Sequence, residues 1–248
     1  MPWLGSRRTG ASGVAGLPAP VAAGPCDASM VPDAASRVAG SVAGVRRGHN
    51  GAMPTVLCLD LMGVVLHDPY LEAIEAAVEV PLAEVWRHKD ATSWPEFECG
   101  VIDEAEFERR FWADAGMAFD AEAFHRARRA GYRFMDGMEA LLGDARAAGL
   151  ELHVASNYPV WIEELRERFG LDELFDGVWA SCHLGVRKPD PRFFERLLDK
   201  VGRPAAQCLF ADDRPPNVEA AAAAGLRAHL FTSAADLRAR LAAEGVPV

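Results

Sequence analysis

Short apolar runs alternate with helical patterns along the chain from residue 55 onward. The runs are continuous and bounded by glycine, proline or charge, as is typical of strands buried on both faces of a sheet. They predict strands within residues 55–61, 150–157, 177–185, 207–213 and 227–232. Helical patterns lie between and after them, at 137–149, 160–170, 190–202, 217–225 and 233–245. This alternation predicts an α/β fold in which helices cover both faces of a parallel sheet.

One long stretch, residues 69–136, breaks the alternation, because only helical patterns follow the first strand there. Aromatic residues recur in it at helical spacing, and we interpret most of them as packing residues: Trp86, Trp94, Phe97, Phe107, Phe111 and Trp112. The stretch therefore predicts an all-helical subdomain inserted into an α/β core formed by residues 53–68 and 137–248.

Acidic residues mark several expected helix starts. Asp103 and Glu106 have the spacing of a helix-start capping arrangement. Asp190 and Asp236 stand near the starts of two later helices, and we interpret both as caps.

Residues 1–52 differ in composition from the rest of the chain. They are rich in Ala, Gly, Val, Ser and Pro, contain no Lys or Glu, and carry five arginines and two aspartates. Such a segment cannot bury enough apolar surface to offset the entropy cost of ordering, so we expect disorder. Three origins are open: a translation start at Met53, a transit peptide, or an export signal suggested by the twin arginine of SRRTG.

The bulk composition is that of an ordinary soluble globular protein, with 50% hydrophobic and 25% charged residues. A net charge of −10 argues against nucleic-acid binding as the main role. No apolar run reaches the roughly 18 residues that span a bilayer. The five cysteines are widely spaced and include no C-x-x-C pair, which disfavours a disulfide framework or a cysteine zinc site. We therefore expect a reducing compartment, the cytoplasm, or a plastid if residues 1–52 are a transit peptide.

The carboxyl ends of the predicted strands carry polar residues that converge on one rim of the sheet. These residues are Asp60, Ser156, Asn157, Lys188 in the loop after the third strand, Asp212 and Asp213. Carboxylates from two strand ends, together with a backbone carbonyl, suit a hard cation such as Mg²⁺. An aspartate beside such an ion can attack phosphorus, while a lysine and a hydroxyl neutralise and orient the phosphoryl group.

Four motifs in order, DLMGVV, VASN, RKPDP and FADDRPPNVEAAAAAG, resemble the capped phosphatases of the haloacid dehalogenase superfamily. The resemblance implies a Rossmann-like core with the inserted helices as a cap. Three further stretches, TSWPEFECGVIDEAEF, SNYPVWIEEL and DDRPPNVEAA, are similar to a plant-type subgroup that includes a chloroplast flavin mononucleotide hydrolase. Members of that subgroup also carry a methionine at the place of Met62.

The resemblance also implies a role for each residue of the rim. Asp60 would be nucleophile and metal ligand, and the Met62 carbonyl would be a second ligand. The other roles fall to Ser156, Asn157 and Lys188 for the substrate phosphoryl group, to Arg214 as a phosphate contact or a helix cap, and to Asp213 with Asp212 for Mg²⁺.

Met62 stands where most phosphatases of this superfamily carry an aspartate that serves as general acid, and methionine cannot transfer protons. Such help is typically worth about 10²–10⁴-fold in rate. A proton source within local reach would be His67, Asp68 or Asn157.

Three functions follow from this reading. The favoured one is a Mg²⁺-dependent phosphatase that acts on a small phosphorylated metabolite through an aspartyl-phosphate. The resemblance to the flavin mononucleotide hydrolase subgroup implies FMN as a candidate substrate, and the aromatic residues of the cap, which could stack on a flat ring, are explained better by packing. The alternatives are a 2-haloacid dehalogenase, which would need no metal, and a catalytically weak phosphate-binding scaffold. The pair Asp212–Asp213 speaks against the dehalogenase.

Overall fold

Five parallel strands form a single sheet in a computed structural model that describes residues 53–113 and 118–248. Their order across the sheet is β3 (Gly177–Ala180), β2 (Glu151–Ser156), β1 (Val56–Leu59), β4 (Cys208–Asp212) and β5 (Arg227–Leu230). Every neighbouring pair is parallel. The sheet confirms the five predicted strands. The expectations for residues 1–52 and for the side chains of Phe111 and Trp112 lie outside what the structure describes.

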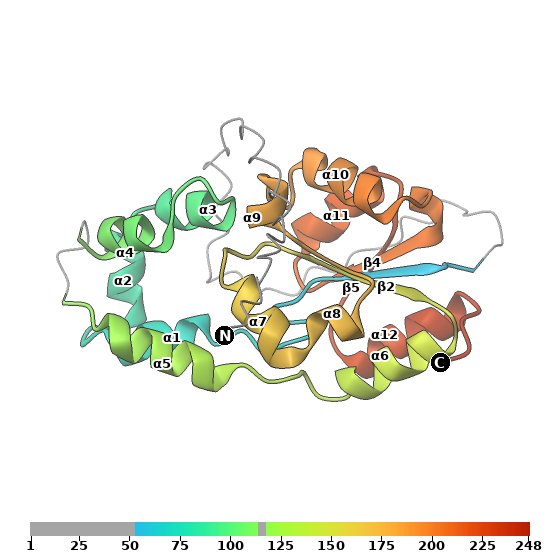
Figure 1. The fold of residues 1–248 in the computed structure, drawn as a ribbon, viewed down its shortest axis with the longest axis horizontal. Coiled ribbons are helices and arrows are strands. Elements are labelled where there is room, and N and C mark those ends of the chain that lie inside the picture. The colour runs from blue at the N-terminus through green and yellow to red at the C-terminus, as the bar shows by residue number, and fades with distance from the viewer. Residues whose placement is uncertain (1–52, 114–117) are drawn as a thin grey trace, which may run out of the picture.

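Helices cover both faces of this sheet, as Figure 1 shows. Val56 and Cys58 of β1 face one way and share a hydrophobic cluster with α10 (Pro191–Val201) and α11 (Pro215–Ala223). Leu57 and Leu59 face the other way and pack in a cluster with α6 (Met138–Ala147), α7 (Ile162–Phe169) and α12 (Ala234–Ala243). Burial on both faces explains why the strand is apolar at successive positions. The predicted α/β, Rossmann-like fold is thus confirmed.

Helix starts follow the side chains that can cap them. Asp190 caps α10 by accepting a hydrogen bond from the Arg192 N–H at 2.9 Å. The interpretation of Asp236 as a cap was wrong, because Ser233 occupies that position and accepts the Asp236 N–H at 3.1 Å. Asp236 instead pairs with His229 at 3.0 Å. Three short elements were not predicted: α8 (Leu171–Leu174), α9 (Ser181–Leu184) and the 3₁₀ turn η1 (Ala205–Gln207).

In the described residues six helices lie between β1 and β2, and the first five of them form the insertion. They are α1 (Tyr70–Ala77), α2 (Leu82–His88), α3 (Ser93–Glu98), α4 (Glu104–Ala113) and α5 (Ala121–Gly131), and they gather at one end of the sheet (Figure 1). Phe97 and Phe107 are buried there and stack at 4.8 Å between ring centroids. Trp94 packs edge-on against both rings. These aromatic residues are packing residues, as the sequence predicted, whereas the boundaries of the cap at residues 69 and 136 stay a prediction.

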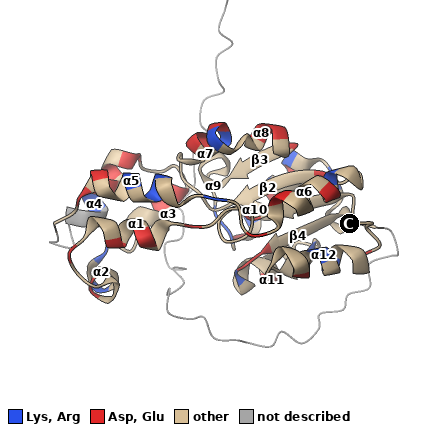
Figure 2. Ribbon diagram, turned by 90° about the horizontal axis from the view of Figure 1, so that it is seen from below, with Lys and Arg blue, Asp and Glu red and all other residues tan. Residues whose placement is uncertain are grey.

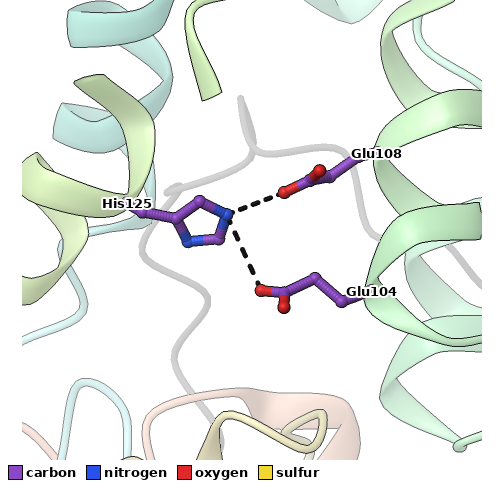
Figure 3. Close-up of side chains that lie close together, drawn as sticks. All are labelled: Glu104, Glu108 and His125. Atoms are coloured by element: carbon purple, nitrogen blue, oxygen red, sulfur yellow. Dashed lines mark hydrogen bonds and ion pairs between the residues drawn. The ribbon is translucent and has the colours of Figure 1, made fainter. Parts of the chain in front are cut away.

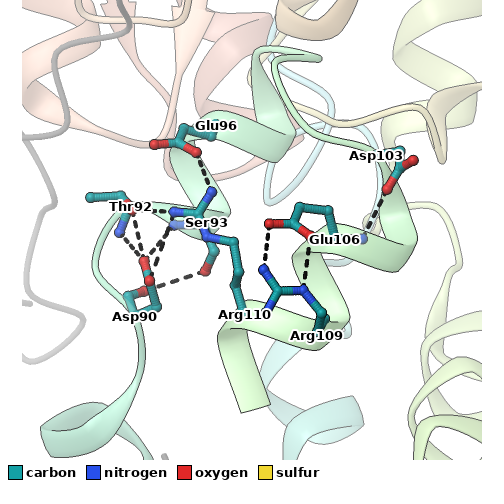
Figure 4. A network of polar contacts seen from close by, with 8 residues as sticks. All are labelled: Asp90, Thr92, Ser93, Glu96, Asp103, Glu106, Arg109 and Arg110. Atoms are coloured by element: carbon teal, nitrogen blue, oxygen red, sulfur yellow. Dashed lines mark hydrogen bonds and ion pairs between the residues drawn. The ribbon is translucent and has the colours of Figure 1, made fainter. Parts of the chain in front are cut away.

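Polar contacts fasten α3 to α4 within the insertion (Figure 4). The Asp90 carboxylate accepts the N–H groups of Thr92 and Ser93, at 2.7 and 2.8 Å, where α3 begins. Arg110 of α4 donates to Glu96 at 2.5 Å and to the Thr92 hydroxyl at 2.6 Å. At the start of α4, Asp103 accepts the Glu106 N–H at 2.8 Å, so the predicted capping arrangement is confirmed.

Charged residues lie mostly on the helices, and the strands carry few of them (Figure 2). This distribution is expected, because burying an unpaired charge is costly. Within residues 53–113 and 118–248, no helix is both long and apolar enough to cross a membrane.

Candidate active site

Three carboxylates meet at the carboxyl ends of the two central strands. Asp60 follows β1 directly, Asp212 ends β4, and Asp213 comes next in the chain. One carboxylate oxygen from each lies within 4.8 Å of the other two. The parallel arrangement of β1 and β4 therefore places the predicted acidic residues together.

Lys188 joins this cluster from the loop between α9 and α10. Its side chain is buried, and its ammonium group donates to Asp212 Oδ2 at 2.6 Å and to the Ala155 carbonyl at 2.7 Å. The same nitrogen lies 3.1 Å from Asp60 Oδ1. The lysine thus bridges the ends of two strands, and the carboxylates raise its pKa although burial opposes the charge.

Asp60 is buried and held in one orientation, since its Oδ1 accepts the Leu61 N–H at 2.7 Å. Burial raises the pKa of Asp60 to about 7. The charge of Lys188 lowers it in part, while the charges of Asp212 and Asp213 add to the rise. The three carboxylates outnumber the Lys188 ammonium and the nearby Arg214 guanidinium, and this surplus of negative charge favours a bound cation.

The two aspartates after β4 differ in their surroundings. Asp212 is fully buried, and besides Lys188 its oxygens accept the Arg214 N–H at 2.8 Å and the Asn217 amide at 3.0 Å. Asp213 is exposed at the rim, where crowding by neighbouring atoms and the charge of Asp212 raise its pKa. Asp212 therefore has its hydrogen-bonding capacity filled by protein groups, whereas Asp213 is open to a ligand from solvent.

Gly63 lets the loop after β1 approach Asp213 closely. Its φ of +80° lies in the left-handed region, and a Cβ placed on it would be 2.9 Å from Asp213 Oδ2. A larger residue at this position would strain the loop and displace the carboxylate.

Ser156 and Asn157 at the end of β2 have different environments. The Ser156 hydroxyl is buried and has no hydrogen-bond partner among the described residues. The Asn157 amide is occupied at both ends, because Nδ2 donates to the Lys188 carbonyl at 2.9 Å and Oδ1 accepts the Lys188 N–H at 2.7 Å. Asn157 thus holds the loop between α9 and α10 in place, while the Ser156 hydroxyl can still form a hydrogen bond with a substrate group.

Two further predicted residues lie beside the carboxylates. Arg214 is exposed, and although desolvation opposes its charge, the carboxylates of Asp213 and Asp60 raise the pKa of the guanidinium. It stands at the position before α11, but its side chain makes no capping hydrogen bond. Met62 is partly buried and packs against the hydrophobic core.

Glu98 and Arg187 join the insertion to the core, and no pattern in the sequence predicted their contact. The buried Glu98 carboxylate at the end of α3 lies 2.7 Å from the Arg187 guanidinium, next to Lys188 in the chain. The Glu98 carbonyl also accepts the Ser181 hydroxyl at 2.5 Å. A single acid outside any periodic pattern could not be assigned a partner 89 residues away without coordinates.

Asp68 lies where the chain leaves the core and enters the insertion. Its carboxylate accepts the Tyr70 N–H at 3.1 Å and is exposed to solvent. Desolvation by surrounding atoms nevertheless raises its pKa, with Arg214 opposing the rise in part.

The donor set at the strand ends fits a magnesium ion. The groups are carboxylate oxygens, which Mg²⁺ prefers, and the cluster carries surplus negative charge. The unpartnered Ser156 hydroxyl beside them suits an oxygen-rich group such as a phosphate.

Comparison with known proteins identifies the family of the chain. Residues 54–225 match the haloacid dehalogenase-like hydrolase family, and the chain belongs to that family. It is 34% identical over 193 residues to flavin mononucleotide hydrolase 1 of Arabidopsis thaliana, described as chloroplastic, with 78% of each chain covered. It is 30% identical over 201 residues to phosphoglycolate phosphatase of Rhodospirillum rubrum, covering 70% of this chain and 78% of that one.

A solved structure shares the fold. It is a haloacid dehalogenase family enzyme of Bacteroides thetaiotaomicron, crystallised with magnesium and inorganic phosphate. Its TM-score is 0.60 at 16% identity, and the match covers 73% of this chain and 95% of that one.

Proposed function

We propose that this chain is a Mg²⁺-dependent phosphatase that hydrolyses small phosphomonoesters through a phosphorylated Asp60. The observation that carries the proposal is the placement of the Lys188 ammonium between Asp60 and Asp212, with Asp213 within metal-sharing distance of both carboxylates. This arrangement offers a nucleophile, a fixed positive charge and an oxygen-lined cation site at one strand edge.

In the first step, the Asp60 carboxylate attacks phosphorus, and the bond from phosphorus to the leaving oxygen breaks. Lys188 neutralises part of the charge on the transferred group, and the Ser156 hydroxyl donates a hydrogen bond to it. In the second step, water attacks the same phosphorus, which releases inorganic phosphate and restores Asp60. Mg²⁺ would be held by Asp60, Asp213 and the Met62 carbonyl, and when bound it supplies charge stabilisation for the phosphoryl oxygens.

The leaving oxygen needs a proton that Met62 cannot give. His67 is paired with Glu72 at 2.8 Å, and the Asn157 amide is occupied by the lysine loop. Asp68 is exposed, its carboxyl can carry a proton, and desolvation raises its pKa above the ordinary value. We therefore assign the role of general acid to Asp68.

FMN is the first substrate to test. The similarity to the Arabidopsis flavin mononucleotide hydrolase supports it. The aromatic residues of the insertion support it less, because Phe97 and Phe107 are buried in packing contacts, whereas Trp86 and Trp94 are among those that are only partly buried. The same relative supports the plastid alternative for the compartment. N-terminal sequencing of the native protein tests that alternative, because an imported protein would have lost the first part of residues 1–52.

The two other functions are not favoured. A metal-free dehalogenase has no need for three carboxylates gathered around one lysine. A non-catalytic scaffold has no need for a nucleophile oriented by its own backbone and paired with a buried ammonium.

The test is the release of inorganic phosphate from a panel of phosphomonoesters that includes FMN, with Mg²⁺ and with a chelator. We expect turnover that requires Mg²⁺ and disappears in Asp60→Asn. Phosphate binding without turnover would favour the scaffold, and halide release from a 2-haloacid without metal would favour the dehalogenase.

A further inference from the structure

A second group of metal-ligating side chains lies in the inserted helices, outside the site at the strand ends. Glu104, Glu108 and His125 point toward one another (Figure 3). His125 Nε2 lies 2.7 Å from Glu108 Oε1 and 3.6 Å from Glu104 Oε1, and one ligand atom from each residue lies within 4.8 Å of the other two. The group combines an imidazole nitrogen with two carboxylate oxygens.

The helices explain how these residues come together. Glu104 and Glu108 are four residues apart on α4 and therefore share one face of that helix. His125 comes from α5, which faces α4 across the space drawn in Figure 3. The three residues line one cavity together with Glu122, Arg126 and Arg129.

The arginines that line this cavity do not offset the negative charge of Glu104 and Glu108, because each is paired with another carboxylate. Arg126 is paired with Glu122 at 3.3 Å, and Arg129 with Glu164 at 3.1 Å. The two carboxylates of α4 face His125. A neutral imidazole does not cancel their negative charge.

Packing holds the imidazole in place. The ring lies edge-on to Phe124 at 5.2 Å and to Trp161 at 5.8 Å between centroids. Trp161 Nε1 also donates to Glu104 Oε1 at 2.5 Å. His125 Nδ1 is buried and has no hydrogen-bond partner in the described part of the chain, so Nε2 is the nitrogen turned toward the carboxylates. The ligand set is therefore oriented before any ion arrives.

We propose that Glu104, Glu108 and His125 bind a divalent transition-metal ion such as Zn²⁺, which ties α4 to α5. An imidazole ligand suits Zn²⁺, whereas the all-oxygen cluster at Asp60 suits Mg²⁺, so the two sites select different metals. Because Nδ1 finds no outer hydrogen bond among the described residues, and most histidine ligands have one, we expect an affinity about 10–100-fold below that of a fully supported site.

Calorimetry with Zn²⁺ and the metal-free full chain tests the proposal, with Mg²⁺ in excess to occupy the strand-end site. We expect one Zn²⁺ bound by these residues. His125→Ala and Glu108→Gln should each weaken binding by at least about 10-fold. Glu122→Gln is the matched control, since it lines the same cavity outside the ligand set, and it should bind as the wild type does.

The proposal would be overturned if the wild type binds no Zn²⁺, or if both ligand variants bind it as tightly as the wild type. The three residues would then be only a hydrogen-bonded contact between α4 and α5. If the variants fail to fold, wild-type crystals soaked in Zn²⁺ decide the matter. An anomalous peak between the three side chains supports the site, and its absence refutes it.

Discussion

Replacing Lys188 by methionine removes the ammonium group but keeps a side chain of similar length. The wild-type nitrogen is buried, with Asp212 Oδ2 at 2.6 Å and Asp60 Oδ1 at 3.1 Å. Removing one partner of a buried ion pair costs about 3–5 kcal/mol, because the remaining charge is left without compensation. We expect Lys188→Met to lose that amount of unfolding free energy at pH 8 in chelator, and to lose turnover.

The sign of the pH dependence follows from the pKa of Asp60, which burial raises to about 7 even with the lysine present. Without the ammonium this pKa rises further. A carboxyl whose pKa is higher in the folded than in the unfolded chain destabilises the fold above its folded pKa. The penalty fades as the pH falls toward the unfolded value of about 3.9. The deficit of the variant should therefore shrink between pH 8 and pH 5, and Mg²⁺ should reduce it at pH 8.

Urea denaturation of wild type and variant measures the deficit at each pH. Lys200→Met is the control, because Lys200 is exposed on α10 and its loss should cost little. A deficit for Lys188→Met below about 1 kcal/mol, the range of exposed ion pairs, would contradict the reasoning. A deficit that stays constant with pH would contradict it equally.

Three further substitutions test other parts of the structure. Gly63→Ala places a Cβ 2.9 Å from Asp213 Oδ2 at a φ of +80°. It should lower the free energy of unfolding by about 1–2 kcal/mol and raise the Mg²⁺ concentration needed for activity. An unchanged Mg²⁺ requirement would refute the contact. Asp68→Asn should slow turnover by about 10²-fold or more on esters with poor leaving groups and much less on p-nitrophenyl phosphate; equal effects on both would exclude Asp68 as the acid. Phe107→Ala should lower the free energy of unfolding, measured with urea or heat, by about 3–5 kcal/mol, because Phe107 is fully buried against Phe97. A small loss would mean that the insertion repacks.

Most of the core could be predicted from the sequence, because its strands are buried on both faces. That burial makes runs such as VLCL continuous and apolar, and such runs are visible without coordinates. The rim residues were found for a related reason. Asp60 and Asp212 interrupt or end apolar runs, and the parallel topology then requires them to be neighbours.

Contacts between the insertion and the core could not be predicted in the same way. Glu98 and Arg187 are far apart in the chain and belong to no periodic pattern, so their ion pair depends on how the helices pack. The cap of α12 was also predicted wrongly, because two nearby residues compete for the position. Ser233 and Asp236 can both cap a helix, and only the backbone conformation shows that Ser233 takes the position. The role of Asn157 in binding substrate stays a prediction, and what the sequence could not show is that its amide bonds to the backbone of Lys188.

The most direct test of the central claim is mass spectrometry of the enzyme quenched in acid during turnover of its best phosphomonoester with Mg²⁺. The proposed mechanism predicts one added phosphoryl group on the peptide that contains Asp60, and no such group in Asp60→Asn. Full turnover with an unmodified Asp60 peptide at every quench time, or a phosphoryl group on another residue, would contradict the account.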